Sequence, residues 1–314
     1  MPQSSAHRVI IAGGSGFLGA ALARRLTESG HDVVALIRSG DQADQAWTVV
    51  RWDGRTIGEW ADVIDGADVI VNLAGRSVDC IKTPDHCDEI LRSRIESTRV
   101  LGEACHRSSS PPRVWVQMST AHIYGDPPSA VCDEDSALGY GLAPDVGRAW
   151  ESEFHNVCPV DTRGVVLRTG FVLGASGGAF VTLSRLVRQR LGGTVGHGAQ
   201  GMSWIHIEDF NRIVDRAISE RSMSGVYIVS APHPVSNREF MKELRNAIGV
   251  RVGLPAPSWM VRFGARFVLH TDPELALYGR YCVPKRLLDD GYEFAFPTLA
   301  PALTDLVRPL AASR

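Results

Sequence analysis

The chain has 314 residues, 44% of them apolar, and its 33 basic and 35 acidic residues leave a formal net charge of −2. This length and apolar content predict a globular protein with a large buried core. The near-neutral charge, without a basic run, argues against nucleic acid or a membrane surface as partner and favours a small-molecule ligand.

The six cysteines form neither a CxxC pair nor a cluster with histidines at metal-ligand spacing. A chain of this size does not need disulfides, so we expect free thiols in a reducing compartment. The first seven residues are short and polar, and no stretch approaches the ~18 uninterrupted apolar residues of a membrane span. The expected location is the cytoplasm.

Residues 9–38 form an apolar strand, a glycine turn, an amphipathic helix and a second apolar strand. The glycines fit both GxGxxG and GxxGxxG, the pattern of a dinucleotide-binding βαβ unit. They allow a tight turn, close approach of the backbone to a pyrophosphate, and contact between helix and sheet. The phosphates would lie on the N-terminus of the helix. The residues expected at the cofactor are Gly13, Gly14, Ser15, Gly16, Phe17, Leu18 and Gly19.

The end of the second strand selects the dinucleotide. An NAD enzyme usually places an acidic residue there, against the ribose hydroxyls, but this chain has Ile37 followed by Arg38. An arginine can bind the 2′-phosphate of NADP through charge-assisted hydrogen bonds. The sequence therefore favours NADP(H), the alternative being that Arg38 is a solvated loop residue.

Strands and helices alternate through the first half of the chain. Further strands are expected at 47–52, 67–73, 113–118 and 164–173, with helices at 56–64 and 85–106 and the end of another at 150–157. Beyond residue 174 we expect a helix at 180–191, a strand at 227–230, and otherwise helical, proline-punctuated chain.

This alternation predicts an α/β fold, a Rossmann-type doubly wound parallel sheet with a smaller C-terminal α/β substrate lobe. The expected cofactor domain is 1–174, with 203–232 returning to it. The substrate lobe is then 175–202 and 233–314.

Two hydroxyl side chains, Ser119 and Thr120, directly follow the strand at 113–118, at the edge where the nicotinamide is expected. The segment STAHIYG (119–125) resembles the active-site segment of the extended short-chain dehydrogenase/reductases, the sugar-nucleotide epimerase group. By this resemblance, Thr120 supplies the catalytic hydroxyl, with Ser119 beside it.

Further motifs run in order from about residue 9 to residue 303. They resemble the NAD-dependent epimerase/dehydratase-like oxidoreductases, a subfamily sometimes labelled cell-division-inhibitor-like, and they imply NADPH as cofactor. The motifs are NLAG (72–75), SRIEST (93–98), WE (150–151), LRTGFVLG (167–174), GHGAQGMSWIHIEDF (196–210), APHPVSNREF (231–240) and VPKRLLDDGYEFAFPTLAPAL (283–303).

The resemblance also implies positions along the cofactor. Arg38 would contact the adenosine phosphate, and Phe171 would flank the nicotinamide. Glu89 and Arg94 would lie along the cofactor, the alternative being a pair of charges on a helix surface. The loop after the fourth strand would line the cofactor with Leu73, Ala74 and Gly75.

The chain departs from the superfamily at its Tyr-x-x-x-Lys pair, in which the phenol is the acid/base and the lysine lowers its pKa. Counted back from Trp150-Glu151, the two positions hold Ala143 and Gly147, and neither can exchange protons. Tyr140 is a candidate displaced acid, and His122 a candidate acid/base with a suitable intrinsic pKa. Tyr124 is expected to be structural.

His206 and Asp209 resemble half of a metal or triad site, but no third ligand stands at metal spacing, so we expect an architectural role and no metal. The glycine-rich segments 174–178 and 192–201 are expected to be mobile loops over the substrate cleft. A homodimer is expected only by analogy with the superfamily.

Two functions are consistent with these patterns. The first is an NADP(H)-dependent oxidoreductase or epimerase-like enzyme acting on a carbonyl or sugar-nucleotide-like small molecule. The alternative is a catalytically silent NADP(H)-binding sensor or interaction protein, because the tyrosine–lysine pair is absent.

Overall fold

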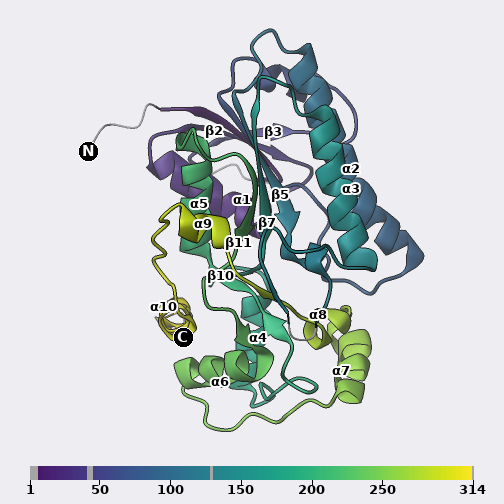
Figure 1. The fold of residues 1–314 in the computed structure, drawn as a ribbon, viewed down its shortest axis with the longest axis vertical. Coiled ribbons are helices and arrows are strands. Elements are labelled where there is room, and N and C mark those ends of the chain that lie inside the picture. The colour runs from purple at the N-terminus through teal and green to yellow at the C-terminus, as the bar shows by residue number, and fades with distance from the viewer. Residues whose placement is uncertain (1–5, 41–44, 128–129, 313–314) are drawn as a thin grey trace.

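A seven-stranded parallel sheet forms the centre of the computed structural model, which describes residues 6–40, 45–127 and 130–312 (Figure 1). Its strand order is β11-β7-β5-β4-β1-β2-β3, so the direction of winding reverses between β1 and β4. In doubly wound sheets, ligands bind where this reversal occurs. The strands are β1 (Arg8–Ala12), β2 (Asp32–Ile37), β3 (Thr48–Arg51), β4 (Val69–Asn72), β5 (Val114–Thr120), β7 (Arg163–Thr169) and β11 (Gly225–Val229).

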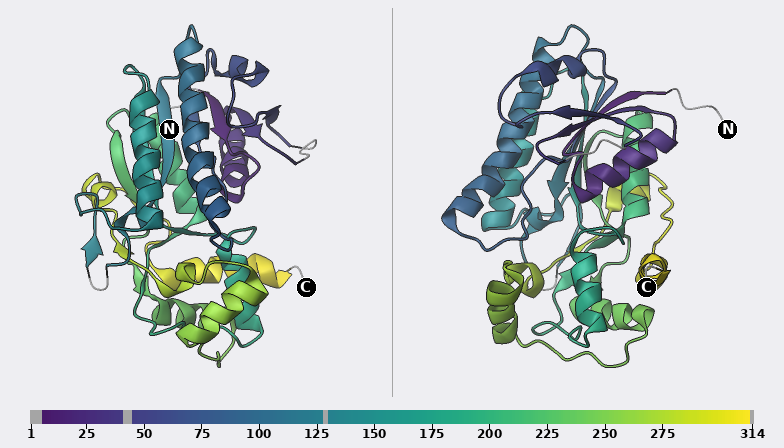
Figure 2. Two further views of the ribbon diagram at one scale, coloured as in Figure 1. Left: turned by 90° about the vertical axis from the view of Figure 1, so that its right-hand side faces the viewer. Right: turned by 180° about the vertical axis from the view of Figure 1, so that it is seen from behind.

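Helices cover both faces of the sheet, which explains the continuous apolar runs of its central strands (Figure 2). On one face, α1 (Phe17–Glu28) and α5 (Ile207–Ser219) pack against Val9 and Ile11. On the other, α2 (Pro84–Arg107) and α3 (Leu142–Val157) pack against Ile10. Successive residues of β1 thus point into two separate cores, as the pleat requires.

The lower half of the molecule in Figure 1 is a smaller lobe. Its core joins side chains of α4 (Ala179–Arg188), α6 (Asn237–Ile248) and α10 (Leu299–Ala312). Shorter helices α7 (Ser258–Gly264), α8 (Glu274–Leu277) and α9 (Lys285–Asp289) follow α6. Three two-stranded sheets complete it: β8 (Phe171–Leu173) with β10 (Trp204–His206), β9 (Gly201–Met202) with β12 (Val235–Ser236), and β6 (Val131–Cys132) with β13 (Tyr281–Cys282).

The chain returns from the lobe to the sheet twice. First, α5 and β11 complete the sheet and one of its helical layers. Later, Leu287, Tyr292 and Phe294 pack into the same core as α1 and α5.

The expectation of a single strand over 164–173 is wrong. β7 ends at Thr169, and β8 leaves the main sheet to pair with β10. Gly170 separates them: its N–H donates to the Val229 carbonyl at 2.9 Å, and a Cβ there would stand 2.3 Å from the Ser203 carbonyl oxygen. Close approach of two backbones turns the chain out of the sheet.

The helix expected at 56–64 is a shorter 3₁₀ helix, Glu59–Ile64. The Asp53 carboxylate accepts hydrogen bonds from the N–H groups of Arg55 and Thr56 at 2.8 and 2.9 Å. This side-chain turn holds the residues that would have started the helix.

Candidate cofactor and substrate site

Gly13, Gly14 and Gly19, in and just after the turn that follows β1, have no room for a side chain. Gly13 has a φ of +85°, and its N–H donates to the Leu36 carbonyl at 3.1 Å. A Cβ on Gly14 would stand 2.5 Å from the Ala35 Cβ, and one on Gly19 2.3 Å from the Gly13 carbonyl oxygen. The strand, turn and helix therefore pack directly backbone to backbone.

The N-terminus of α1 opens onto the same turn. The residue before the helix, Gly16, provides no side-chain cap, and Ser15 beside it is exposed. Uncapped N–H groups and the helix dipole together favour an anion at this end. The turn therefore fits a pyrophosphate, as its sequence predicts.

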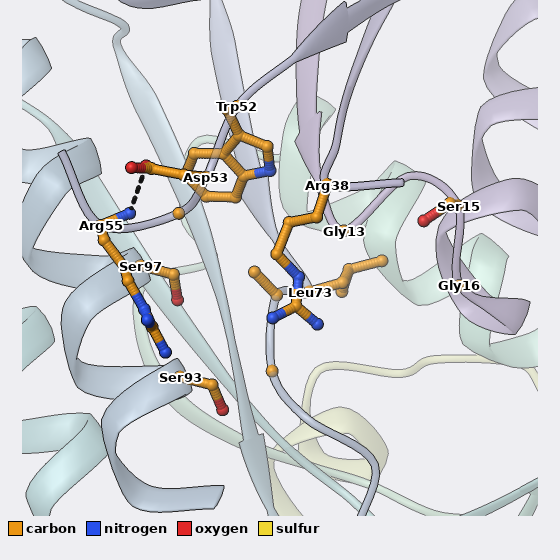
Figure 3. Close-up of a pocket in the computed structure, with 13 residues that line it drawn as sticks. Gly13, Ser15, Gly16, Arg38, Trp52, Asp53, Arg55, Leu73, Ser93 and Ser97 are labelled. Carbon is orange, nitrogen blue, oxygen red and sulfur yellow. Dashed lines mark hydrogen bonds between the residues drawn. The ribbon is translucent and has the colours of Figure 1, made fainter. Parts of the chain in front are cut away.

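A pocket extends from this turn across the carboxyl ends of β2, β3 and β4 to α2 (Figure 3). In Figure 3, the exposed side chain of Arg38 extends from the end of β2 toward Leu73. The pocket lies where the winding of the sheet reverses, as ligand sites in doubly wound folds do. Its lining residues are Gly13, Ser15, Gly16, Arg38, Trp52, Asp53, Gly54, Arg55, Leu73, Ala74, Gly75, Ser93 and Ser97.

The far wall of the pocket was missed from the sequence. Burial alone would raise the pKa of Asp53. Hydrogen bonds from Thr56 and from backbone N–H groups have the larger, opposite effect, so the net shift of the pKa is downward. Arg55 forms an ion pair with Glu96 at 2.9 Å, and it brings a second guanidinium to the pocket. The sequence could have indicated this wall, because Trp52-Asp53 directly follows β3 and ligands bind at the carboxyl edge of such a sheet.

The loop after β4 is fixed by one buried amide. The Asn72 side chain accepts a hydrogen bond from the Ala74 N–H and donates to Thr98 and Gln117, each at 3.1 Å. Ala74, one of these partners, lines the pocket. Leu73, Ala74 and Gly75 are consequently held in place before any ligand arrives.

Glu89 and Arg94 do not pair with each other. Glu89 pairs with Arg76, whereas the Arg94 guanidinium donates to the carbonyls of Arg76 and Ile90 at 3.0 and 2.9 Å and lies 5.0 Å from the Trp150 ring. Burial lowers the pKa of Arg94 to about 10. The alternative of a surface pair is therefore wrong. Neither side chain is among those that line the pocket of Figure 3, although Ser93 on the same helix is.

Ser119 is occupied by a buried network. Its Oγ donates to Glu151 Oε1 at 2.6 Å, and Arg168 binds both carboxylate oxygens of Glu151, at 2.9 and 2.8 Å. Arg168 also donates to the Tyr124 hydroxyl at 2.9 Å. This side of the strand end is a closed structural network, and the structural role expected for Tyr124 fits it.

Thr120 is available instead. Its Oγ1 accepts a hydrogen bond from the His122 N–H at 3.1 Å, which caps the 3₁₀ helix Ala121–Tyr124. Within the described parts of the chain, no acceptor takes the Thr120 hydroxyl proton. Thr120 is thus the hydroxyl at the end of β5 that can donate to a ligand.

Of the two other proton-exchange candidates, His122 lies at the same strand end as Thr120. Burial, followed by the charges of Arg280 and Lys82, holds the pKa of His122 well below its usual range. Tyr140, just before α3, is 93% exposed. At Gly147, where the superfamily has its lysine, a Cβ would stand 3.0 Å from the Ile123 side chain, so α3 packs closely against the strand end.

Phe17 packs where the glycine turn meets the lobe, and Phe171 belongs to the lobe. Added Cβ atoms on Gly174 and Gly177 would stand 2.4 and 2.7 Å from the Phe17 ring, so this ring packs directly on the segment after β8. The ring of Phe171 lies 6.1 Å from that of Phe240 in the lobe core. Leu18 packs against the core beneath α1.

His206 and Asp209 are architectural. His206 Nδ1 accepts a hydrogen bond from the Glu208 N–H at 3.1 Å, and Asp209 accepts from the N–H groups of Ala295 and Phe296 at 2.7 and 2.9 Å. No group of three potential metal ligands occurs in residues 6–40, 45–127 and 130–312. None of the helices in these ranges is long and apolar enough to span a membrane.

Comparison with known proteins agrees with this geometry. Residues 9–229 match the NAD dependent epimerase/dehydratase family, and residues 256–306 match a domain of unknown function, DUF1731. The human epimerase family protein SDR39U1 is 33% identical over 307 residues, which cover 96% of this chain and 99% of the human protein. YfhF of Bacillus subtilis is 30% identical, over 95% of this chain and 97% of its own.

Among solved structures, human SDR39U1 (isoform 2) with NADPH superposes with a TM-score of 0.85 at 31% identity, over 96% of this chain and 99% of that one. A nucleoside-diphosphate sugar epimerase from Corynebacterium glutamicum gives 0.75 at 29%, over 95% of this chain and 57% of that one. The sheet topology, the glycine turn and the match over residues 9–229 lead to one conclusion. The chain belongs to the NAD dependent epimerase/dehydratase family.

Proposed function

We propose that the chain is an NADP(H)-dependent oxidoreductase or epimerase-like enzyme that acts on the carbonyl or alcohol of a small molecule. The observation that carries this proposal is the pocket at the sheet reversal, with a glycine turn at one end and Arg38 at the end of β2. The human relative whose structure contains NADPH supports the choice of cofactor.

The residues fit this cofactor. Side chains at Gly13, Gly14 and Gly19 would fill the space that the backbone of this turn needs, and the uncapped end of α1 faces the same place. Arg38 provides the positive charge for a 2′-phosphate, and β2 ends without the carboxylate that would repel it. Asp53 and Trp52 line the opposite wall for the adenosine half.

When bound, the nicotinamide supplies or accepts the hydride. Thr120 orients the substrate, because its hydroxyl proton is free to donate to a carbonyl oxygen while its Oγ1 stays anchored by the His122 N–H. His122 is the side chain at this strand end that can exchange a proton with that oxygen, directly or through water. The Glu151–Arg168 pair keeps Ser119 turned away, which fixes the end of β5.

A side-by-side fluorescence titration of the protein with NADPH and NADH tests the cofactor. We expect a clear preference for NADPH that Arg38→Ala removes and Arg24→Ala, at an exposed position on α1, retains. Equal binding of the two dinucleotides by the unchanged protein would refute the role of Arg38. Binding of neither would refute the whole proposal.

A second function is favoured by one observation, the absence of an acid/base pair at Ala143 and Gly147. The chain would then sense NADP(H) without turning over a substrate. A screen of carbonyl compounds and sugar nucleotides in the presence of NADPH separates the two functions. Net oxidation of NADPH, or epimerisation of a sugar nucleotide without net oxidation, supports the enzyme. Tight NADPH binding with neither change supports the sensor.

A further inference from the structure

Arg280 is a buried arginine that forms no salt bridge to a carboxylate in the described ranges of the chain. It is 8% exposed, and its Nε donates to the Gly125 carbonyl at 2.7 Å. In the described ranges of the chain, no carboxylate oxygen lies within 4.0 Å of its guanidinium, and neither Nη atom donates a hydrogen bond. A buried guanidinium without an anion is costly, and it is the group that binds oxyanions through its two-pronged edge.

Gly125 connects the backbone of His122 to this arginine. The Gly125 N–H donates to the His122 carbonyl at 3.0 Å, while the Gly125 carbonyl accepts from Arg280. In the described ranges, the His122 ring nitrogens form no hydrogen bond. The lowered pKa of His122, caused by burial and then by the charges of Arg280 and Lys82, agrees with this proximity.

The other charged or titratable groups nearby are already engaged. Cys132 and Cys282, which lie near Arg280, hydrogen-bond to each other. Lys82, in the segment before α2, lies 3.7 Å from Asp272. Asp126 accepts a hydrogen bond from the Gly279 N–H at 2.7 Å. Besides the Thr120 hydroxyl, the side-chain donors that remain for a ligand are therefore the N–H groups of Arg280 and His122.

The two side chains come from segments that meet at the substrate side. His122 is two residues beyond Thr120, which ends β5, and Arg280 directly precedes β13. The Arg280 backbone is fixed on both sides, because its N–H donates to the Gly201 carbonyl at 3.0 Å and its carbonyl accepts from Ser203 Oγ at 2.8 Å. Figure 1 shows α8, which precedes Arg280 in the chain, below the lower edge of the sheet.

We propose that Arg280 and His122 form a subsite for an oxyanion of the substrate, a carboxylate or a phosphate, beside the carbonyl that Thr120 holds. The substrate role rests on the proposed function, whereas oxyanion binding is a property of the site itself. The substrates are thus oxyanion-bearing carbonyl compounds or the corresponding alcohols.

This arrangement links binding to proton supply. An oxyanion beside Arg280 offsets the positive charge that disfavours protonation of His122, and it hydrogen-bonds to the protonated ring. Oxyanion binding therefore raises the pKa of His122. The ring becomes a proton donor when a substrate of the right charge is present.

The test follows the His122 ring by NMR, with its signal assigned from the variant His122→Asn. The pKa of the ring is measured on the NADPH-saturated protein in matched chloride, then with inorganic phosphate and separately with malonate. We expect at least one of these anions to raise it. A response to phosphate or to malonate identifies which oxyanion the subsite takes, and no response to either overturns the proposal.

Variants locate the effect. Arg280→Gln is expected to weaken anion binding by about tenfold or more, because a charge-assisted hydrogen bond is lost, while Arg221→Gln, at an exposed position after α5, is expected to change nothing. Retained NADPH binding shows that each variant is folded. If the anions still raise the pKa of His122 to the same extent in folded Arg280→Gln, the subsite is contradicted and the cofactor proposal stays intact. Failure of the wild-type protein to bind NADPH refutes the proposed function separately.

Discussion

At the scale of single residues, the structure gives two adjacent hydroxyls different hydrogen-bond partners, a difference that local sequence does not reveal. Ser119 and Thr120 both follow the strand, and motif resemblance favours Thr120. The structure adds the reason, because Ser119 donates to Glu151 and is 2% exposed. Glu151 and Arg168 are 17 positions apart in different elements, so no local pattern showed that they would bind this serine.

The two hydroxyls should respond differently to mutation. Thr120→Val removes the hydroxyl that we propose donates to the substrate carbonyl while it keeps the shape, so turnover should fall by about 10²-fold or more with NADPH affinity unchanged. Thr120→Ser should retain most of the rate. Steady-state kinetics and the NADPH titration check this, and full activity of Thr120→Val would contradict the assignment.

Ser119→Ala should act on stability. The substitution removes the Ser119 donor from one buried oxygen of Glu151. We expect this loss to lower the free energy of unfolding by about 1–3 kcal/mol. Denaturant titration measures the loss, and Ser222→Ala, on the exposed surface, serves as the control. A Ser119→Ala protein as stable as the wild type would show that the network does not need this hydroxyl.

At the scale of elements, the βαβ unit is the part that the sequence predicted best. Apolar runs, glycine spacing and the arginine after β2 are local signals, and the structure places them around one pocket. The helix expected at 56–64 and the single strand expected over 164–173 were predicted incorrectly. Both depend on partners outside the local window, an aspartate turn in one case and the Ser203 backbone in the other.

The glycine turn offers a test at this scale. Gly19→Ala places a Cβ 2.3 Å from the Gly13 carbonyl oxygen, so α1 must move away from the turn. We expect the variant to lose NADPH affinity by at least about tenfold. Gly30→Ala is the matched control for the cofactor site, because no atom lies within 4 Å of its added Cβ and any strain from its φ of +87° is confined to the far end of α1. Equal NADPH affinity of Gly19→Ala and the wild type would show that the turn does not hold the pyrophosphate.

At the scale of the whole molecule, three histidines with lowered pKa values set a pH dependence. Burial is the main cause that lowers the pKa of His31, His122 and His206 in the folded state. The unfolded chain therefore binds more protons than the folded one below about pH 6.5, and stability is lost as the pH falls through this range.

Chemical denaturation between pH 7.5 and about 5.5 measures this loss. His122→Asn should flatten the slope relative to the wild type, because one proton-linked group is removed. Glu134 and Asp209 have raised pKa values, caused by burial, and they oppose the trend at the acidic end of the range. A wild-type free energy of unfolding that stays constant or rises on acidification would contradict this account.

The path of the chain has a practical consequence for dissecting the protein. A fragment that stops at residue 174 contains the whole glycine turn, yet it lacks β11 and α5, which come from beyond the lobe. Its β7 would be left as an open edge strand, and the part of the sheet face that α5 covers would be exposed, which favours aggregation. Cofactor binding is therefore best studied in the uncut chain, and truncation libraries should return insoluble products wherever the cut precedes residue 229.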